Sequence, residues 1–410
     1  MKSAYLLLAL SLPLAAGKDL PSWIQEAAHR PMPSYSSKVT QEVLFSEERL
    51  AVAPDGKRSM TERQAIRILQ TSKHSLFAAR TYNTKTGRIR DFRAWMLPTS
   101  GSVVEYDKKR IVDVALDQQG SYDEARAKVI ECDPNSSPGT IFAYEVTEDE
   151  DTIFTTYHYA FQDADPTAVS RFVLTLPAAW EENGILFNHA PVAPQTSGNT
   201  YTWELRDLPW IEAQDYGPGM HDLAPRLGVT YFPASTPNHA LTPLKDWTSV
   251  SSWFARFADP AAALTPPVSS KTSELTRAAA NDMDRIRALA KFVQQTNYVS
   301  VQMNIEHGGG YTPRPATDVL QKNYGDCKDK ATLLRALLKG AGIDSYAVSL
   351  YSGDRDYVKR EWASPMQFNH AIIAIKLPAG VESLAAVESA KLGRLLIFDP
   401  TDPYTPVGDL

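Results

Sequence analysis

The N-terminal half of the chain alternates apolar and polar residues in short runs between about residues 40 and 230. This alternation is typical of a β-strand that turns one face to a core and the other to solvent. Turn-forming residues separate the runs, which include residues 42–45, 141–146, 153–159, 171–177 and 200–205. Short strands that follow one another in this way predict a mostly-β sandwich for this half.

The C-terminal half changes to a mixture of helical and extended patterns. Asn281 is a predicted helix cap, and apolar residues follow it at helical spacing, at Met283, Ile286, Ala290 and Val293. A second helix is predicted after the cap residue Asp326, with an apolar face formed by Ala331, Leu334, Leu337 and Leu338. Extended runs lie around it, at residues 298–302, 345–351, 368–375 and 394–400. This order predicts an α+β domain whose second helix packs on an antiparallel sheet.

The chain has 410 residues, which exceeds one ordinary hydrophobic core and predicts more than one domain. Its content of 43% hydrophobic and 22% charged residues is that of a globular protein. Proline-rich segments at 233–243 and 260–267 interrupt the pattern between the two halves. We therefore expect a β-rich domain at 18–245, a proline-rich connection at 246–280 and a second domain at 281–410.

The first seventeen residues have the features of a secretory signal peptide. Lys2 precedes an apolar run at 5–14, and the small residues Ala15 and Gly17 favour cleavage before Lys18. The run is too short to span a membrane comfortably, and no later segment approaches the roughly twenty apolar residues that a membrane span needs. We expect an exported protein, periplasmic or extracellular, with no integral membrane segment after cleavage.

The charge balance restricts the partners that the chain can bind. Lys and Arg total 42 against 48 Asp and Glu, which gives a formal net charge of −6. Proteins that bind nucleic acid usually carry basic patches, and no basic run stands out here. We therefore expect no nucleic-acid partner.

Three polar residues of the C-terminal half suit nucleophilic catalysis. Cys327 lies in the first turn of the second predicted helix, where the positive end of the helix dipole favours a thiolate nucleophile. His370 lies in the run at 368–375 and is the first suitable base downstream. Asp399 is near the end of the run at 394–400. If these two strands pair in antiparallel fashion, sulfur, imidazole and carboxylate form a triad.

Each of these residues also has another interpretation. An even cysteine count in an exported chain usually indicates pairing, so a Cys132–Cys327 disulfide is an alternative to a nucleophile. His370 is also consistent with a hydrogen-bonded core residue, and Asp399 before Pro400 is consistent with the start of a turn. A zinc site made of the three is the weakest alternative, because a clustered ligand motif is absent.

Three short motifs resemble the transglutaminase-like superfamily, a branch of the papain-like cysteine enzymes: residues 325–331 (GDCKDKA), 368–371 (FNHA) and 398–401 (FDPT). More narrowly, the chain is similar to bacterial proteins in which a domain of unknown function precedes a transglutaminase-like core. The resemblance implies that Cys327 is the nucleophile and that His370 is the general base and acid. It implies that Asp399 orients the imidazole.

Further expectations follow from the same resemblance. A polar side chain should help the Cys327 backbone N–H to bind the oxyanion, and Gln302 is our candidate, with Gln321, Tyr298 and Tyr324 as rivals. The superfamily implies no cofactor and no metal. Its members usually continue further past the aspartate, which implies a natural chain longer than 410 residues.

These observations predict an exported cysteine acyl-transfer enzyme that acts on a carboxamide, in a peptide or isopeptide bond, through a thioester. Water is the expected acceptor, because the bacterial relatives resemble peptidases or amidohydrolases more than cross-linking enzymes. The substrate would then be a peptide or protein. Two alternatives stay open: a cross-linking transglutaminase with an amine acceptor, and a non-catalytic envelope module that binds a peptide or a cell-wall strand.

Overall fold

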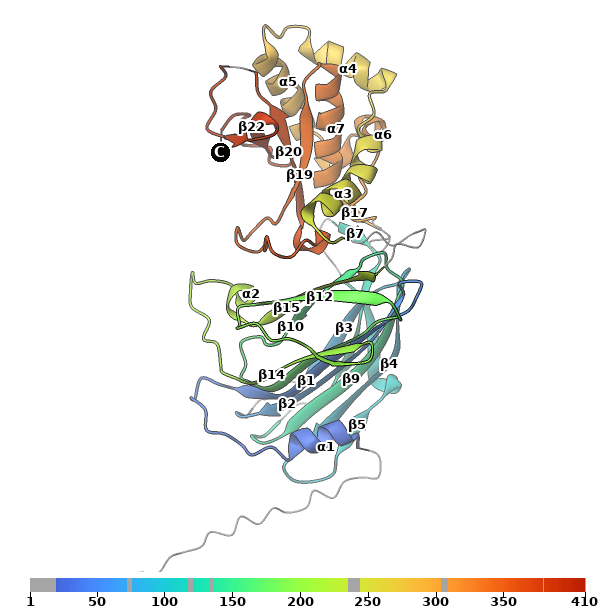
Figure 1. Cartoon of the computed structure of the whole chain (residues 1–410), viewed down its shortest axis with the longest axis vertical. Helices are drawn as coiled ribbons and strands as arrows, with labels where there is room; N and C mark the ends of the chain where they lie inside the picture. The colour runs from blue at the N-terminus through green and yellow to red at the C-terminus, as the bar shows by residue number, and fades with distance from the viewer. Residues whose placement is uncertain are drawn as a thin grey trace, which may run out of the picture.

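A β-rich part and a mixed α and β part follow each other along the molecule (Figure 1). None of the helices in the described residues is both long and apolar enough to cross a membrane. The predicted signal peptide at 1–17 lies outside the described residues. The computed structural model describes the backbone alone for residues 121–123 and 302, and describes in full the rest of residues 20–71, 76–116, 121–132, 136–234, 244–303, 309–378 and 380–409.

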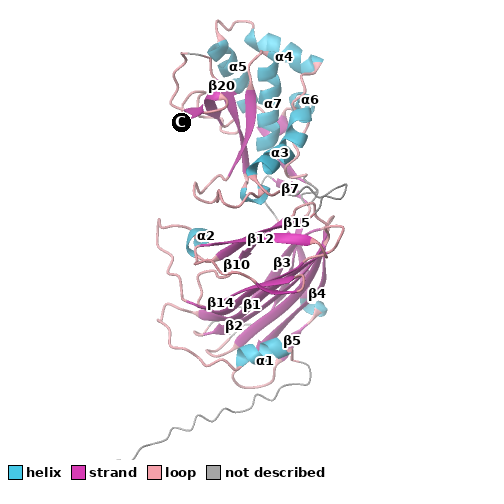
Figure 2. Cartoon of the chain, viewed as in Figure 1, coloured by secondary structure: helices cyan, strands magenta, loops and turns pink. Residues whose placement is uncertain are grey.

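The β-rich part is built on an eight-stranded sheet (Figure 2). Strands β1 and β11 pair in parallel, and the other neighbours in this sheet are antiparallel. In sheet order, the strands are β13 (Gln195–Ser197), β14 (Thr200–Leu208), β11 (Thr167–Thr175), β1 (Gln41–Val52), β2 (Arg58–Ile68), β9 (Ile141–Glu150), β4 (Gly87–Leu97) and β5 (Val104–Tyr106).

Two three-stranded sheets pack on this large sheet. One contains, in order, β10 (Thr156–Ala160), β15 (Arg226–Pro233) and β12 (Trp180–Phe187), and the other contains β3 (Phe77–Asn83), β8 (Ala125–Glu131) and β6 (Ile111–Ala115). Each shares a buried apolar cluster with the large sheet. Helix α1 (Ser22–Ala28) contributes Ile24 to a third cluster, together with Trp95 of β4. The predicted mostly-β sandwich is therefore confirmed.

The alternating sequence pattern has a direct structural cause in β11. Phe172 and Leu174 lie fully buried in the core between the large sheet and the sheet of β15. Arg171 points to the other side, where its guanidinium bonds to Glu47 at 3.0 Å and to Glu204 at 2.7 Å. One face of the strand is thus apolar and packed, and the other carries cross-strand ion pairs.

The C-terminal part combines helices with a four-stranded antiparallel sheet. In sheet order, the strands are β19 (Ser345–Leu350), β20 (His370–Lys376), β22 (Gly393–Phe398) and β21 (Ala386–Ser389). Side chains of α5 (Asp282–Gln294), α6 (Ala316–Lys322) and α7 (Cys327–Gly340) form one buried cluster with β20 and β22. This is the predicted α+β core, with the cysteine helix packed on an antiparallel sheet.

Residues 246–280, expected to be a proline-rich connection, contain two helices, α3 (Trp247–Ala261) and α4 (Pro266–Thr276). Pro266 is the first residue of α4. Proline is well tolerated there, because a backbone N–H at this position would have no acceptor within the helix. Val268 is fully buried in the same cluster as α5 and α7. The packed C-terminal core therefore extends N-terminal to residue 281.

The connection between β19 and β20, residues 351–369, packs on the β-rich part. Trp362 lies over Gly228 of β15, where a Cβ atom would come within 2.5 Å of the indole ring. The indole N–H of Trp362 donates to Thr230 Oγ1 at 3.2 Å, and the hydroxyls of Ser364 and Thr156 lie 3.0 Å apart. This connection leads directly into β20. The β-rich part therefore supports the segment just before His370, the first residue of β20.

Candidate active site

Cys327 is the first residue of α7, and its position follows from the local sequence. The side chain of Asp326 accepts a hydrogen bond from Asp329 N, and the side chain of Asp329 accepts one from Asp326 N, which makes a capping box. Gly325 allows this turn, because a Cβ atom there would lie 2.5 Å from the Cβ atom of Asp329. The half-buried Cys327 side chain therefore sits at the positive end of the helix dipole.

The structure contradicts the disulfide alternative. Cys327 is a free cysteine at the N-terminus of α7. Cys132 lies in the buried cluster between the large sheet and the sheet of β3 and β8. The two residues thus belong to different parts of the molecule, and the sulfur of Cys327 is available for chemistry.

His370 and Asp399 meet at one end of the C-terminal sheet. Strands β20 and β22 are antiparallel, with Ile373 opposite Phe398, so the start of β20 lies beside the end of β22. His370 Nε2 lies 2.7 Å from Asp399 Oδ2. The other carboxylate oxygen, Oδ1, accepts hydrogen bonds from the Thr401 backbone N–H at 2.8 Å and from its hydroxyl at 2.6 Å. The carboxylate is thus held by donors on both oxygens.

These contacts favour a charged imidazole. Hydrogen bonds to Asp399 and to the Cys327 side chain raise the pKa of His370 to about 10, against the opposing effect of burial. Burial of Asp399 opposes its ionisation, but the hydrogen bonds from His370 and Thr401 outweigh it and lower the Asp399 pKa. Since Nε2 faces Asp399, Nδ1 is the nitrogen that faces the sulfur. The structure therefore brings the three predicted residues together, with His370 between Cys327 and Asp399.

Tyr298 is a fourth group at the sulfur. It lies in β16 (Asn297–Tyr298), which pairs with β18 (Tyr324–Gly325), so that Tyr298 stands opposite Gly325, two residues before the cysteine. Its hydroxyl hydrogen-bonds to the Cys327 side chain and lies at the Cys327 backbone N–H. Burial, the charges of Cys327 and Asp326 and the side-chain hydrogen bond raise the pKa of Tyr298 to about 12. The phenol therefore keeps its proton at neutral pH.

The four oxyanion candidates have different places in the structure. Gln302, the first choice, ends β17 (Ser300–Gln302), which pairs with β7 (Ser121–Asp123) of the β-rich part, and its side chain lies outside the described ones. Gln321 is exposed on α6. The Tyr324 ring lies against the Arg314 guanidinium, 4.8 Å from the ring centre. Among the described side chains of these four, only that of Tyr298 interacts with Cys327.

Lys330 supports the position of Tyr298 from one turn further along α7. Its side chain is buried, and its ammonium donates to the backbone carbonyl oxygens of Thr296 at 2.9 Å and Gln294 at 3.2 Å. These two residues form the end of α5 and the turn that leads into β16. Lys330 was not among the predicted site residues, although a lysine on the apolar side of a helix is itself a signal for a buried polar contact.

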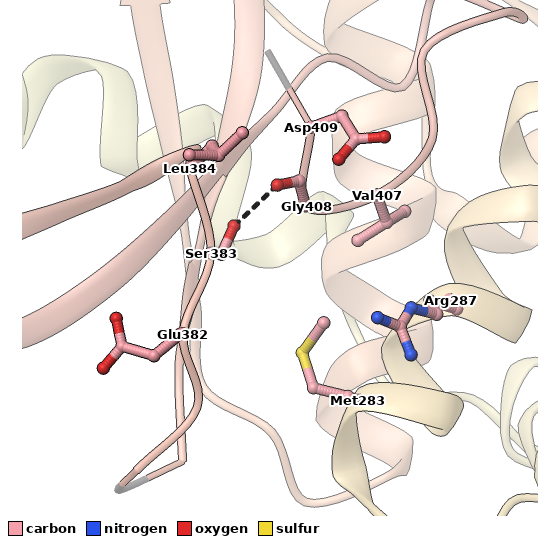
Figure 3. Close-up of a pocket in the computed structure, with 8 residues that line it drawn as sticks. All are labelled: Met283, Arg287, Glu382, Ser383, Leu384, Val407, Gly408 and Asp409. Atoms are coloured by element: carbon pink, nitrogen blue, oxygen red, sulfur yellow. Dashed lines mark hydrogen bonds between the residues drawn. The ribbon is translucent and has the colours of Figure 1, made fainter.

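A separate cavity of about 400 Å³ lies between α5 and the C-terminal residues (Figure 3). Met283 and Arg287 line it from α5, and Ser383 closes one side through a hydrogen bond to the Gly408 carbonyl oxygen at 2.8 Å. None of the triad residues lines this cavity. It holds neither a sulfur nucleophile nor an imidazole, so it does not compete with Cys327 as a catalytic site.

Two family models match the sequence. Residues 269–380 match the model described as the transglutaminase-like superfamily. Residues 54–212 match a domain of unknown function, DUF3857, for which a solved structure exists. The first range includes Cys327 and His370, and Asp399 follows it. A search of curated proteins found no match.

One solved structure shows a related fold, and two others align with low TM-scores. The crystal structure of a candidate protease from Parabacteroides distasonis superposes with a TM-score of 0.65 at 13% identity, covering 82% of this chain and 65% of that one. This chain thus spans less than two thirds of the length of that protein. A candidate cysteine protease from Cytophaga hutchinsonii has a TM-score of 0.23 at 12% identity, covering 84% of this chain and 76% of that one. An M1 zinc metallopeptidase from Deinococcus radiodurans has a TM-score of 0.26 at 9% identity, covering 54% and 53%.

Proposed function

Because residues 269–380 belong to the transglutaminase-like superfamily, we propose that the chain is an exported cysteine peptidase or amidohydrolase that cleaves a carboxamide through a thioester. One observation carries the proposal. His370 bonds to Asp399 through Nε2 at 2.7 Å and to the side chain of Cys327 at the N-terminus of α7. Nucleophile, proton carrier and orienting carboxylate are the three groups that acyl transfer through sulfur requires.

The first half of the reaction forms the thioester. The Cys327 thiolate attacks the carboxamide carbon, an S–C bond forms, and the carbonyl oxygen becomes an oxyanion. The His370 imidazolium then gives its proton to the leaving nitrogen as the C–N bond breaks. The raised pKa of His370 supplies the charged form for this step at neutral pH. The Asp399 carboxylate keeps the ring in place.

The oxyanion needs hydrogen-bond donors at the sulfur. The backbone N–H of Cys327 is one, at the positive end of α7. The Tyr298 hydroxyl is the second, in place of Gln302, because it already contacts both the sulfur and this N–H. Bound substrate would displace the Tyr298 hydroxyl from the sulfur. The hydroxyl would then donate a hydrogen bond to the oxyanion, which stabilises the transition state.

Water is the acceptor that we propose for the thioester. Tyr298 is 53% exposed, and the Asp399 side chain is 36% exposed, so the row of catalytic groups opens to solvent. His370, now neutral, takes a proton from water as the water oxygen attacks, and the S–C bond breaks to return the thiolate. The net reaction adds one water to one amide. A primary amine would resolve the same thioester if the protein were a cross-linking transglutaminase.

Export rests on residues 1–17, whose charged, apolar and small-residue regions are those of a secretory signal. The proposed substrates are therefore peptides or proteins outside the cytoplasm. A fusion of residues 1–17 to a reporter enzyme would be secreted if this is right. The same fusion with Leu8→Arg in the apolar run should stay inside the cell.

A peptide library tests the reaction itself. The library contains internal peptide bonds, glutamine side chains and lysine isopeptide bonds, and it is incubated with the wild type and with Cys327→Ala. Mass spectrometry should find hydrolysed products with the wild type alone. Adding a primary amine should leave most product hydrolysed.

Two outcomes would replace the proposal. Products that form only when the amine is present would make the protein a cross-linking transglutaminase. Retention of intact peptides by the wild type and by Cys327→Ala alike, with no turnover by either, would make the core a non-catalytic binding module.

A further inference from the structure

A cavity of about 470 Å³ lies inside the β-rich part, between the large sheet and the sheet of β10 and β15. Ser46 of β1 and Gln64 of β2 line it from the large sheet. His158 of β10 and Arg226 of β15 line it from the small sheet. His221, from the short helix α2 (Met220–Leu223), also lines the cavity. The triad residues belong to other elements, so this cavity is distinct from the candidate active site.

Arg226 is the unusual member of this cavity. The residue is only 2% exposed, yet Nε and Nη2 have no hydrogen-bond partner among the described residues. The rings of Phe187 and Tyr357 lie against its guanidinium, 5.2 and 5.7 Å from the ring centres. Burial lowers the pKa of Arg226. A buried guanidinium without hydrogen-bond partners is costly to the folded protein, which indicates that something outside the chain satisfies it.

The two Arg226 atoms without partners restrict the geometry of a group that could bind them. Nε and Nη2 form one edge of the guanidinium, and their two N–H bonds point in nearly the same direction. This edge matches the two oxygens of a planar carboxylate, which accepts both bonds in parallel. The aromatic rings contact the guanidinium of Arg226 without supplying hydrogen-bond acceptors, so they leave this edge for a ligand.

A neutral histidine, His158, adds a donor beside Arg226. The Nε2 atom of His158 is buried and has no hydrogen-bond partner in the described part of the chain. Burial, with smaller effects of the charges on Arg226 and His221, lowers the pKa of His158 to about 4. His158 is therefore neutral at neutral pH, and a neutral imidazole can donate one hydrogen bond to an anion.

The acidic residues near His221 are paired with groups of the protein itself. His221 Nε2 lies 3.2 Å from the carboxylates of Asp222 and Asp354. Lys359, however, places its ammonium 2.9 Å from Asp222 and already balances that charge. The cluster is an ion-pair network that joins α2 to the connection 351–369.

We propose that this cavity binds the carboxylate of a small ligand, such as the free carboxyl group of a short peptide, with Arg226 as the bidentate donor. Asp163 and Asp165 line the cavity beside Gln162, and they disfavour a doubly charged phosphate while they suit a ligand with an ammonium group. Tyr357 belongs to the connection that leads into β20, so Arg226 contacts both the cavity and that connection. The proposal is independent of the proposed reaction at Cys327.

Calorimetric titration of the full chain tests this site. The host is Cys327→Ala, which prevents turnover, and the probes are Ala-Ala, its C-terminal amide and inorganic phosphate. Ala-Ala should bind, and the amide should bind about 10- to 100-fold more weakly, because it lacks the charged acceptor. This comparison uses one folded protein and needs no further variant.

Variants then locate the binding. Arg226→Met should abolish binding of Ala-Ala. Arg226→Lys should weaken it about 10-fold or more, because an ammonium group lacks the two parallel N–H donors of a guanidinium. Arg206→Met, on an exposed arginine of β14, should bind like the host. Circular dichroism and thermal melting should show Arg226→Met folded and at least as stable as the host without ligand, since a buried charge has been removed.

Several results would overturn the proposal. Equal affinity for Ala-Ala and its amide, no binding of either, or preference for inorganic phosphate would each reject a carboxylate site. Binding of Ala-Ala that survives Arg226→Met would place the ligand elsewhere. A large loss of thermal stability in Arg226→Met without ligand would make Arg226 a structural residue.

Discussion

At the scale of single residues, His370 determines what the site can do, because each of its ring nitrogens faces a different partner. Nε2 faces Asp399, and Nδ1 faces the sulfur of Cys327. The carboxylate stabilises the imidazolium, and an imidazolium beside a sulfur is an arrangement typical of nucleophilic cysteines. Both hydrogen bonds therefore act on the protonation state of one ring.

Asp399→Asn should lower the pKa of His370, because the bond to Asp399 is the largest effect that raises it to about 10. The wild type should keep its activity on the alkaline side until His370 loses its proton near pH 10. In Asp399→Asn this limb should move to lower pH by about one unit or more, and kcat should fall by about 100-fold. The measurement is kcat/KM against pH.

Asp402→Asn is the matched control for that experiment. Asp402 is a nearby carboxylate that accepts hydrogen bonds from Tyr404 and Thr405. The dependence of kcat/KM on pH in Asp402→Asn should follow that of the wild type. An unchanged alkaline limb in Asp399→Asn would show that His370 is not the group that limits the rate at high pH.

Tyr298→Phe tests the second oxyanion donor. The phenol ring stays, and the hydroxyl that contacts Cys327 is removed. We expect kcat to fall about 10- to 100-fold with KM little changed, since the donor acts in the transition state. Gln302→Ala is the comparison, and steady-state kinetics on both variants separates them. A larger loss of kcat in Gln302→Ala would return the role to Gln302.

At the scale of elements, the N-terminus of α7 is held by its cap and by a buried lysine. The capping box of Asp326 and Asp329 orients the first turn. Lys330 ties this helix to the turn before β16, and the β16–β18 pairing sets Tyr298 opposite Gly325. The catalytic arrangement thus depends on how α7 and β16 are joined, in addition to the triad side chains.

Lys330→Met should destabilise this joint. The substitution keeps most of the volume but leaves the carbonyl oxygens of Gln294 and Thr296 without their donor, at a cost of about 1–3 kcal/mol in the free energy of unfolding. Displacement of β16 should also lower kcat. Urea denaturation and kinetics measure both effects.

Lys339→Met, on an exposed lysine in the last turn of the same helix, is the control and should change the free energy of unfolding by less than about 0.5 kcal/mol. Equal stability of the two variants would mean that water replaces the ammonium of Lys330 at no cost.

At the scale of the whole molecule, the β-rich part is coupled to the active site through residues 351–369. Trp362 packs on Gly228 and bonds to Thr230, and the connection then ends at His370. The pairing of β17 with β7 is a second link between the two parts. The N-terminal part therefore contributes to the placement of His370.

Trp362→Ala should weaken this coupling. Removing the buried indole leaves a cavity over Gly228, at a cost of about 3–5 kcal/mol in the free energy of unfolding. Scanning calorimetry should then resolve separate transitions for the two parts, and kcat should fall as His370 becomes less well positioned. Tyr404→Ala, at an exposed aromatic residue, should leave the thermogram unchanged. A single unshifted transition in Trp362→Ala would contradict the coupling.

The sequence predicted the large features of the fold for local reasons. The alternation around Phe172 reports which face of a strand is buried, and the cap at Asp326 is set by residues within one turn. The pairing of His370 with Asp399 could be predicted because only residues 377–392, which contain β21, separate their two strands along the chain. The helices in 246–280 were not predicted, since proline was interpreted as a break although Pro266 begins a helix.

The sequence by itself determined the strand and helix pattern, the helix start at Cys327 and the order of the three triad residues, because each depends on neighbours a few positions away. The tertiary structure alone decided that Tyr298, with its hydroxyl at the sulfur, is our oxyanion donor, and that Arg226 faces a cavity beside Tyr357. The physical reason is that these contacts join segments far apart in the chain. Their pairing register and packing leave no periodic trace in the sequence.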